Sequence, residues 1–272
     1  MIAYQHLIEQ ILKYGARKDD RTGVGTVSLF GTTFEHDLGY SFPALTTKKL
    51  AFKTMAAELA CFVKGHTDVR EFHKRGCYIW DANLAAYLTK NPPADAEANF
   101  DLGPIYGEQW RDFNGVDQMR AVIDEAKVNP NSRRLLVTAW NPPAIPAMVL
   151  PPCHYAWQLN ISNGRADLIF VMRSVDVMLG LPFDLASYAL LTHLIANELQ
   201  LTPGRVIAQL GDTHIYNNHL KGAYQVLERV PYALPKLVLH CKPGMPVEQF
   251  EPDMAELINY QFHPAIKLDM AV

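Results

Sequence analysis

The 272-residue chain has few cysteines, no surplus of positive charge and no long apolar run. Its four cysteines stand far apart, without a C-x-x-C pair or a zinc-type spacing, which is typical of a reduced intracellular protein. The formal net charge of −3 argues against a basic surface for a nucleic acid polymer. No stretch reaches the roughly 18 apolar residues of a membrane-spanning helix, and the N-terminal residues are unlike a signal peptide. We therefore expect a cytoplasmic protein that binds no nucleic acid polymer, no membrane and no metal.

The composition is that of a folded protein, because 49% of the residues are hydrophobic and only 19% are charged. Apolar residues recur at helical spacing over residues 2–14, 50–65 and 183–201. Segments rich in β-branched and aromatic residues predict strands at 133–141, 155–162 and 166–174, and a strand pair or hairpin at 26–38. Residues 91–104 predict a loop. With neither an internal repeat nor a linker, we expect a single α+β domain over residues 1–272.

Cys153 is the candidate nucleophile. It follows a proline pair in "LPPCHYAW", where a strand is expected to begin, with His154 beside it. Most free cysteines are small buried hydrophobic residues, and this reading stays open. A thiolate favoured by neighbouring cations is the alternative, since arginines occur in the adjoining segments.

Four arginines stand at the ends of predicted strands or loops, next to small or polar residues: Arg21, Arg133, Arg134 and Arg173. An isolated surface arginine is usually only solvated, but a cluster of guanidinium groups is well suited to a phosphate dianion. The chain has neither the G-x-x-x-x-G-K-[ST] nor the G-x-G-x-x-G motif. The phosphate would therefore belong to a small nucleotide held by arginines.

Two further features point to proton transfer and hydroxyl recognition. Glu58 lies among apolar neighbours in a predicted helix, where burial would raise the pKa of its carboxyl group. The segment "GDTHIYNNH" contains His214, Tyr216 and His219, whose spacing fits no common helical zinc motif. We favour hydroxyl recognition over a metal pair.

Seven collinear segments resemble the thymidylate synthase family. They are "DRTG" at 20–23, "FPALTTKK" at 42–49, "LGPIYGEQWR" at 102–111, "SRRLLVTAWNP" at 132–142, "PPCH" at 151–154, "RSVDVMLGLPFDLASYALL" at 173–191 and "GDTHIYNNH" at 211–219. The resemblance implies a mixed β-sheet packed by helices, with one sheet face forming a homodimer interface and with shared active sites. It also implies 5,10-methylenetetrahydrofolate as co-substrate and no metal.

The resemblance implies a role for each matching residue. Cys153 matches the nucleophile that adds to carbon 6 of the pyrimidine, and the proton-handling residues match Glu58, Tyr106 and His154. The phosphate ligands match Arg21, Arg133, Arg134, Arg173 and Ser174, and the residues on the deoxyribose hydroxyl match His214 and Tyr216. The folate-binding residues match Lys48, Ile79, Trp80, Leu150, Asp176, Leu179, Gly180, Phe183 and, in the C-terminal tail, Ala271.

Asp184 departs from the family pattern, which has an asparagine after "GLPF" to recognise uracil. Cytosine presents an acceptor at ring nitrogen 3 and a donor at the 4-amino group, so a carboxyl group that carries a proton satisfies both. An ionised carboxylate would instead oppose the 4-keto oxygen of uracil. A purely structural aspartate at the start of a helix is the alternative. The sequence therefore predicts a catalytic and substrate-binding role for Asp184 in an enzyme for deoxycytidylate, dCMP, similar to those of bacteriophages that replace cytosine in their DNA.

The product depends on whether hydride or water meets the one-carbon unit at carbon 5. Trp80 and Tyr106 are retained and favour a closed aromatic wall, whereas Ala51 and Asn83 replace the bulkier rings usual in the family and could admit water. We expect methyl transfer to dCMP, with dCMP hydroxymethylation as the alternative. A thymidylate synthase acting on dUMP and a nucleotide- or mRNA-binding relative without turnover are the remaining alternatives.

Overall fold

The computed structural model describes residues 2–20, 22–92 and 97–270. Six strands form one mixed sheet in the order β1-β2-β6-β5-β4-β3. Their bounds are Ala16–Lys18 for β1, Thr26–Asp37 for β2, Leu136–Thr138 for β3, His154–Ser162 for β4, Arg165–Asp176 for β5 and Thr202–Tyr216 for β6. β5 and β6 are parallel and the other neighbours antiparallel. A separate two-stranded sheet pairs β7, Lys236–Leu239, with β8, Ala255–Ile258.

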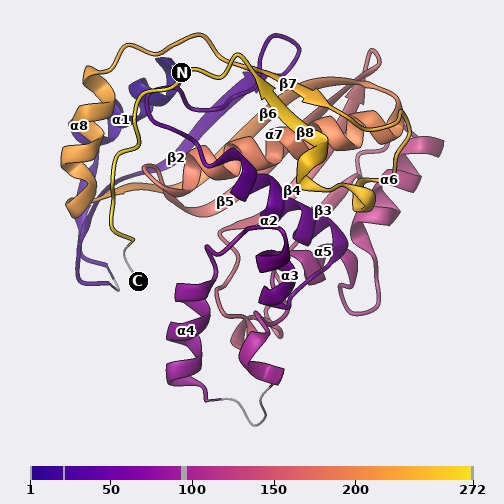
Figure 1. Ribbon diagram of the computed structural model, residues 1–272, viewed down its shortest axis with the longest axis horizontal. Coiled ribbons are helices and arrows are strands. Elements are labelled where there is room, and N and C mark those ends of the chain that lie inside the picture. Colours follow the sequence, from indigo (N-terminus) through magenta and orange to yellow (C-terminus); the bar gives the residue numbers. More distant parts are fainter. Residues whose placement is uncertain (1, 21, 93–96, 271–272) are drawn as a thin grey trace.

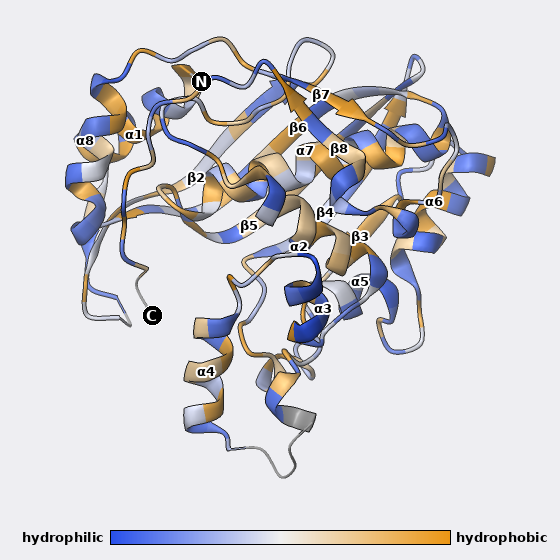
Figure 2. Cartoon of the chain, in the orientation of Figure 1, coloured by the Kyte–Doolittle hydropathy of each residue, from blue (hydrophilic) through white to orange (hydrophobic). Residues whose placement is uncertain are grey.

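Most of the helices pack on the large sheet or on one another (Figure 1). They are α1 (Ile2–Tyr14), α2 (Phe52–Lys64), α3 (Val69–Lys74), α4 (Asp81–Lys90), α5 (Tyr106–Arg111), α6 (Gln118–Val128), α7 (Gly180–Leu199) and α8 (Leu220–Glu228). α7 connects the parallel strands and packs on both of them, and α2 packs on α7. Most residues of α2 and α7 are buried, and Figure 2 shows the hydrophobic residues gathered on these helices and on the strands. The core therefore lies between sheet and helices, which confirms the predicted α+β fold class.

The other face of the sheet has no helix of the same chain packed on it in the described ranges. Residues of the strands alternate between buried and less buried, as expected when one face meets the core. Four apolar residues, Leu136, Ile169, Val171 and Ile207, stand at register positions on the open face and are exposed or half-buried. In the single chain these four apolar side chains are therefore partly accessible to solvent.

The predicted helices at 2–14 and 50–65 are confirmed, whereas the strand pair or hairpin predicted at 26–38 is wrong. α1 and α2 have the expected bounds to within two residues, and Gly65 ends α2 in the left-handed conformation, with φ at 80°. Residues 26–37 form one continuous strand instead of a hairpin, because β6 pairs with β2 along its whole length. Residues 97–100 form a 3₁₀ turn within the expected loop. No helix of the described chain has both the length and the apolar character to cross a bilayer.

α7 begins three residues before the predicted range 183–201. Gly180 is its first residue, and the Asp176 side chain accepts hydrogen bonds from the Met178 and Leu179 amides at 2.8 and 3.1 Å. Asp184 therefore lies inside the helix, so it does not cap the N-terminus. Its carboxyl group is free for another role.

Candidate active site

A cavity of about 1090 Å³ lies between α2, α4, α5 and the start of α7 on one side and the ends of β5 and β6 on the other. α4 projects from the body of the molecule, and the C-terminal segment runs down past α8 toward the same side (Figure 1). Sixteen of the predicted site residues line this cavity: Glu58, Ile79, Trp80, Tyr106, Leu150, Cys153, His154, Arg173, Ser174, Asp176, Leu179, Gly180, Phe183, Asp184, His214 and Tyr216. Tertiary structure thus gathers residues that are up to 158 positions apart in the sequence.

Cys153 is half-buried immediately before β4, where the β4–β5 register shifts between His154 and Ala156. Its backbone amide donates a hydrogen bond to the Tyr106 hydroxyl at 2.8 Å. The Arg173 guanidinium lies 3.9 Å from Sγ and is held by the carbonyls of Pro151 and Pro152 at 3.0 and 2.8 Å. The proline pair therefore fixes the cation beside the sulfur.

The electrostatic environment of Cys153 is mixed. Burial raises the pKa of the thiol, and the nearby Arg173 guanidinium lowers it without reversing the shift. Arg173 thus favours the thiolate, as predicted. The pKa of the Cys153 thiol is nevertheless raised overall in the free chain, because burial has the larger effect. Arg133 and Arg134, which the family resemblance implies reach the site of the other subunit, are exposed before β3 and are not among the described residues that line the cavity.

Glu58 lies in α2 and is buried, as the sequence suggested. Burial, together with the charge of Asp184, raises the pKa of Glu58 to about 8, so this carboxyl group is largely protonated at neutral pH. Its Oε1 accepts a hydrogen bond from Trp80 Nε1 at 2.8 Å. The contact holds the indole ring in the cavity wall, so Glu58 also positions Trp80.

Asp184 points into the same part of the cavity. Burial, with the charge of Asp176, raises the pKa of Asp184 to about 7. Its Oδ1 lies 3.8 Å from Nε2 of His154, and the His154 ring stacks on Tyr106 with centroids 3.9 Å apart. Burial lowers the pKa of His154 to about 3, so the imidazole is neutral. The site therefore holds two carboxyl groups that can carry protons near pH 7 and a neutral imidazole between tyrosine and aspartate.

The opposite wall suits a flat heterocycle with polar edges. Trp80, Leu179 and Phe183 supply apolar surface, and the Asp176 carboxylate stands at the start of α7 to accept hydrogen bonds. A pterin ring offers such faces and N–H donors, so these residues fit methylenetetrahydrofolate.

One predicted ligand, Lys48, lies away from the cavity. The buried ammonium of Lys48 donates to the Met178 carbonyl, and burial lowers the pKa of Lys48 to about 8. Lys48 therefore supports the segment just before α7 and is not among the described residues of the cavity wall. Arg21 and Ala271 fall outside the residues that the structure describes.

His219 does not lie in the cavity wall, although the sequence grouped it with His214 and Tyr216 for hydroxyl recognition. It is fully buried, and its Nε2 lies 2.8 Å from the Asp269 carbonyl while Nδ1 lies 3.8 Å from Asp176. It joins the C-terminal segment to the folate-side wall and is not among the described lining residues. Within the described ranges no group of three or more potential ligands could hold a metal ion.

Sequence reasoning missed several lining residues, including Lys18, Tyr87 and Asp212. Asp212 could have been found, because it stands two residues before His214 in a strand and therefore on the same face. Lys18 forms an ion pair with Asp212 at 3.0 Å. Tyr87 had no local signal, since α4 brings it to the cavity only through its packing.

Comparisons with known proteins agree with this geometry. The model of the thymidylate synthase family matches residues 2–272. The chain is 44% identical over 294 aligned residues to a protein named thymidylate synthase of Enterobacteria phage T4, and the alignment covers 100% of both chains. The chain therefore belongs to the thymidylate synthase family, whose members are dimeric enzymes that transfer a one-carbon unit from methylenetetrahydrofolate to carbon 5 of a pyrimidine nucleotide.

Proposed function

We propose that this enzyme methylates carbon 5 of dCMP. The single observation that supports the choice of base is Asp184, a buried carboxyl group with a pKa near 7 that faces the cavity beside His154. Such a group can donate to ring nitrogen 3 of cytosine and accept from the 4-amino group. Uracil needs the opposite pair, an acceptor for its N3–H and a donor for its 4-keto oxygen.

Cys153 is proposed as the covalent nucleophile. Its sulfur bonds to carbon 6 of the ring, and nitrogen 3 takes a proton from Asp184 as the ring electrons move to carbon 5. Carbon 5 then becomes nucleophilic, and methylenetetrahydrofolate supplies the one-carbon unit. We propose that the phosphate is held by Arg173, Arg21 and Ser174, together with the arginine pair Arg133 and Arg134 from the other subunit. The deoxyribose hydroxyl is proposed to be held by His214 and Tyr216. To give a methyl product, carbon 5 must also lose its proton, and the folate would supply the hydride that reduces the one-carbon unit, being oxidised itself to dihydrofolate. The proton on nitrogen 3 then returns to Asp184 as the bond between Cys153 and carbon 6 breaks.

The product is proposed to be the methyl compound, since the wall nearest Cys153 is tightly packed. Trp80 and Tyr106 are 6% and 4% exposed, and both rings pack against Phe62. Ala51, which could have admitted water, is exposed before α2 and is not among the described lining residues. Asn83 does line the cavity and is the observation that favours hydroxymethylation as the alternative.

The homodimer is proposed to form through the open face of the sheet. That face presents apolar side chains from β3, β5 and β6 to solvent in the single chain. Arg133 and Arg134 are exposed beside it, immediately before β3. We propose that this pair completes the phosphate site of the partner subunit.

The test compares kcat/KM for dCMP and dUMP in the wild-type enzyme and in Asp184→Asn. Buried hydrogen-bond mismatches discriminate by about 10⁴-fold, so we expect dCMP to be preferred on that order and the variant to shift toward dUMP. A wild-type preference for dUMP would overturn the proposal and favour the activity named for the phage T4 relative. Mass spectrometry of the product distinguishes the gain of a methylene unit from the gain of a whole formaldehyde unit.

A further inference from the structure

Tyr188 stands one helical turn after Asp184 in α7, so both side chains lie on the same face of the helix. The Tyr188 hydroxyl lies 2.9 Å from Nδ1 of His154, while Asp184 Oδ1 lies 3.8 Å from Nε2 of the same ring. The two residues of α7 therefore bracket the two nitrogens of one imidazole. No sequence motif assigned Tyr188 a role, and it is not among the described lining residues of the cavity.

The imidazole has a fixed orientation. The His154 ring stacks on Tyr106 at an interplanar angle of 9°, and the Tyr188 ring stacks on Phe170 with centroids 4.2 Å apart and an angle of 6°. Tyr188 is only 2% exposed. Packing thus keeps each nitrogen beside the same partner, and a ring flip cannot exchange them.

A neutral imidazole carries one proton, on either nitrogen. If Asp184 is ionised, it can only accept, so His154 is best protonated on Nε2 and Nδ1 accepts from the tyrosine hydroxyl. If Asp184 carries a proton, it can donate to Nε2, and the imidazole proton then sits on Nδ1 and is donated to the tyrosine oxygen. A hydroxyl can serve in both cases because it both donates and accepts.

We propose that Tyr188 is a positioning residue that lets His154 change its tautomer as Asp184 gains or loses its proton. This inference rests on the proposed function, because that exchange is what a proton-donating Asp184 needs during addition to cytosine. No proton is gained or lost over the cycle. Asp184 gives one proton to ring nitrogen 3 and takes it back. The imidazole of His154 and the phenol of Tyr188 each keep one proton throughout. Burial raises the pKa of Tyr188 well above its ordinary value, which is consistent with a phenol that stays protonated.

The separation of 3.8 Å between Asp184 and His154 exceeds a direct hydrogen bond. Catalytic contacts often shorten only when substrate is bound, and a shift of about 1 Å would suffice here. The titratable groups that face Asp184 from the surrounding elements are Glu58, Tyr106, Cys153, His154, Asp176 and Tyr188. Of these, only His154 lies between Asp184 and a hydroxyl group, that of Tyr188, which can either donate or accept a hydrogen bond.

The first test is nitrogen-15 NMR of histidine in the free homodimeric enzyme between pH 5 and 9. In the wild type we expect the His154 proton to move from Nδ1 to Nε2 as Asp184 ionises. In Tyr188→Phe, Nδ1 loses its partner, and a buried bare acceptor is tolerated better than a buried unpaired N–H. We therefore expect His154 to keep the proton on Nε2 at every pH. A wild-type tautomer that ignores pH, or a variant that follows the wild type, would overturn the inference.

The second test is the pH profile of kcat/KM. In Tyr188→Phe the Nε2–H of His154 always faces Asp184 and favours its ionised carboxylate. The apparent pKa at which kcat/KM falls as Asp184 loses its proton should therefore be lower by about one unit in this variant. An unmoved limb would contradict the inference.

The matched control is Tyr260→Phe. The Tyr260 hydroxyl accepts from the Leu50 amide and donates to the Leu45 carbonyl, away from the cavity. This variant should leave both the His154 tautomer and the pH limb in place, and a shift as large as that of Tyr188→Phe would overturn the inference. Nucleotide preference is scored separately: a tautomer exchange in an enzyme that prefers dUMP would refute the proposed substrate and not the exchange.

Discussion

At the scale of single residues, the site depends on carboxyl groups that burial keeps protonated. Glu58 and Asp184 would both be ionised in water at pH 7, but their pKa values in the cavity are about 8 and about 7. Each can therefore donate a proton under physiological conditions, and Arg173 supplies a fixed positive charge beside Cys153. Burial thus determines which residues can act as acids.

Cys153→Ala should abolish product formation, because no other group in the described cavity wall is a thiol that could add to carbon 6. Nucleotide binding should persist, since Arg173, Ser174 and Asp184 are untouched. Turnover assays and calorimetric titration with dCMP check the two halves. Turnover near the wild-type rate would show that the covalent mechanism is wrong.

Asp184→Asn should change the pH dependence of stability. The folded state holds the Asp184 proton up to about pH 7 and the unfolded state only to about pH 4, so the wild type loses stability as pH rises between these values. By about pH 8 the accumulated cost is a few kcal/mol, which asparagine does not incur.

The check is urea unfolding of both proteins at pH 5 and pH 8. One protein concentration is used, because stability of a dimer depends on it. The variant should gain relative to the wild type at the higher pH. A difference in unfolding free energy that is the same at both pH values would contradict the assigned pKa.

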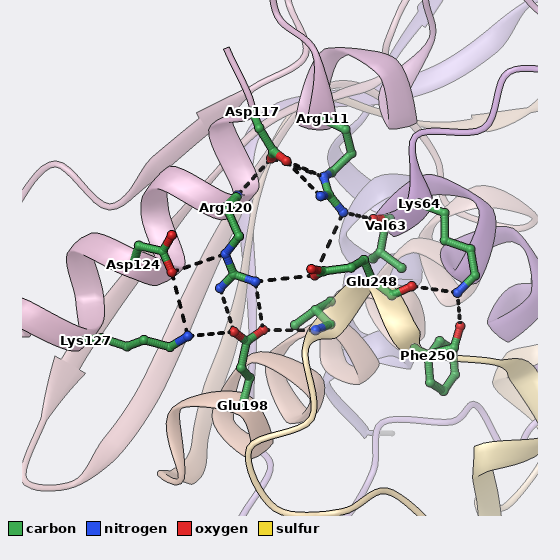
Figure 3. Close-up of polar contacts among 11 residues, drawn as sticks. Val63, Lys64, Arg111, Asp117, Arg120, Asp124, Lys127, Glu198, Glu248 and Phe250 are labelled. Carbon is green, nitrogen blue, oxygen red and sulfur yellow. Dashed lines mark hydrogen bonds and ion pairs between the residues drawn. The ribbon is translucent and has the colours of Figure 1, made fainter.

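At the scale of elements, α7 organises the molecule at both ends. Its first turns contribute to the cavity, and its last turn contributes Glu198 to a polar network with α6 and the segment after β7 (Figure 3). The Glu198 side chain is 2% exposed and accepts hydrogen bonds from Arg120, Lys127 and the Val247 amide at 2.6, 2.9 and 2.9 Å. This network joins the segment after β7 to α6 and to the end of α7.

Glu198→Gln should destabilise the enzyme by about 2 kcal/mol at pH 7, because Arg120 and Lys127 lose their shared carboxylate. Burial raises the pKa of Glu198, but the hydrogen bonds from Arg120 and Lys127 outweigh it and lower the pKa overall. The stabilisation is therefore present above the ordinary glutamate pKa and is lost as pH falls through the folded value.

Urea unfolding at pH 7 and pH 3.5 measures the difference. Exposed Glu9→Gln in α1 is the matched control and should change stability by less than about 0.5 kcal/mol. Equal effects of the two substitutions at pH 7 would mean that the network does not stabilise the fold.

At the scale of the whole molecule, each active site is proposed to use arginines from both subunits. A mixture of Cys153→Ala and Arg134→Ala subunits then tests the sharing. In a mixed dimer one site carries both defects and the other carries neither. Reassembly of the two inactive variants should restore up to about a quarter of wild-type activity, as two-fold symmetry requires. If activity after mixing is only the sum of the separate variants, the arginine acts within its own subunit.

The sequence alone determined the chemistry that is available. Alternation and helical spacing predicted α1, α2 and the strands β2, β3, β4 and β5, but not β1, β6, β7 or β8. The predicted elements are those in which local hydrogen bonding and burial of one face leave a short-range pattern. Collinear motifs indicated the family and sixteen of the 29 described residues that line the cavity. The sequence showed that Asp184 replaces the asparagine usual in the family, but it did not show what the carboxyl group contacts.

Tertiary structure decided how those residues are used, since pKa and contact depend on groups distant in the sequence. It placed Lys48 and His219 behind the cavity wall, moved the start of α7 to Gly180 and left Arg133 and Arg134 outside the cavity of their own chain. It also set Tyr188 against His154. No local pattern encodes such pairings, because they arise only when helix α7 packs against the β4–β5 sheet and excludes water from between them.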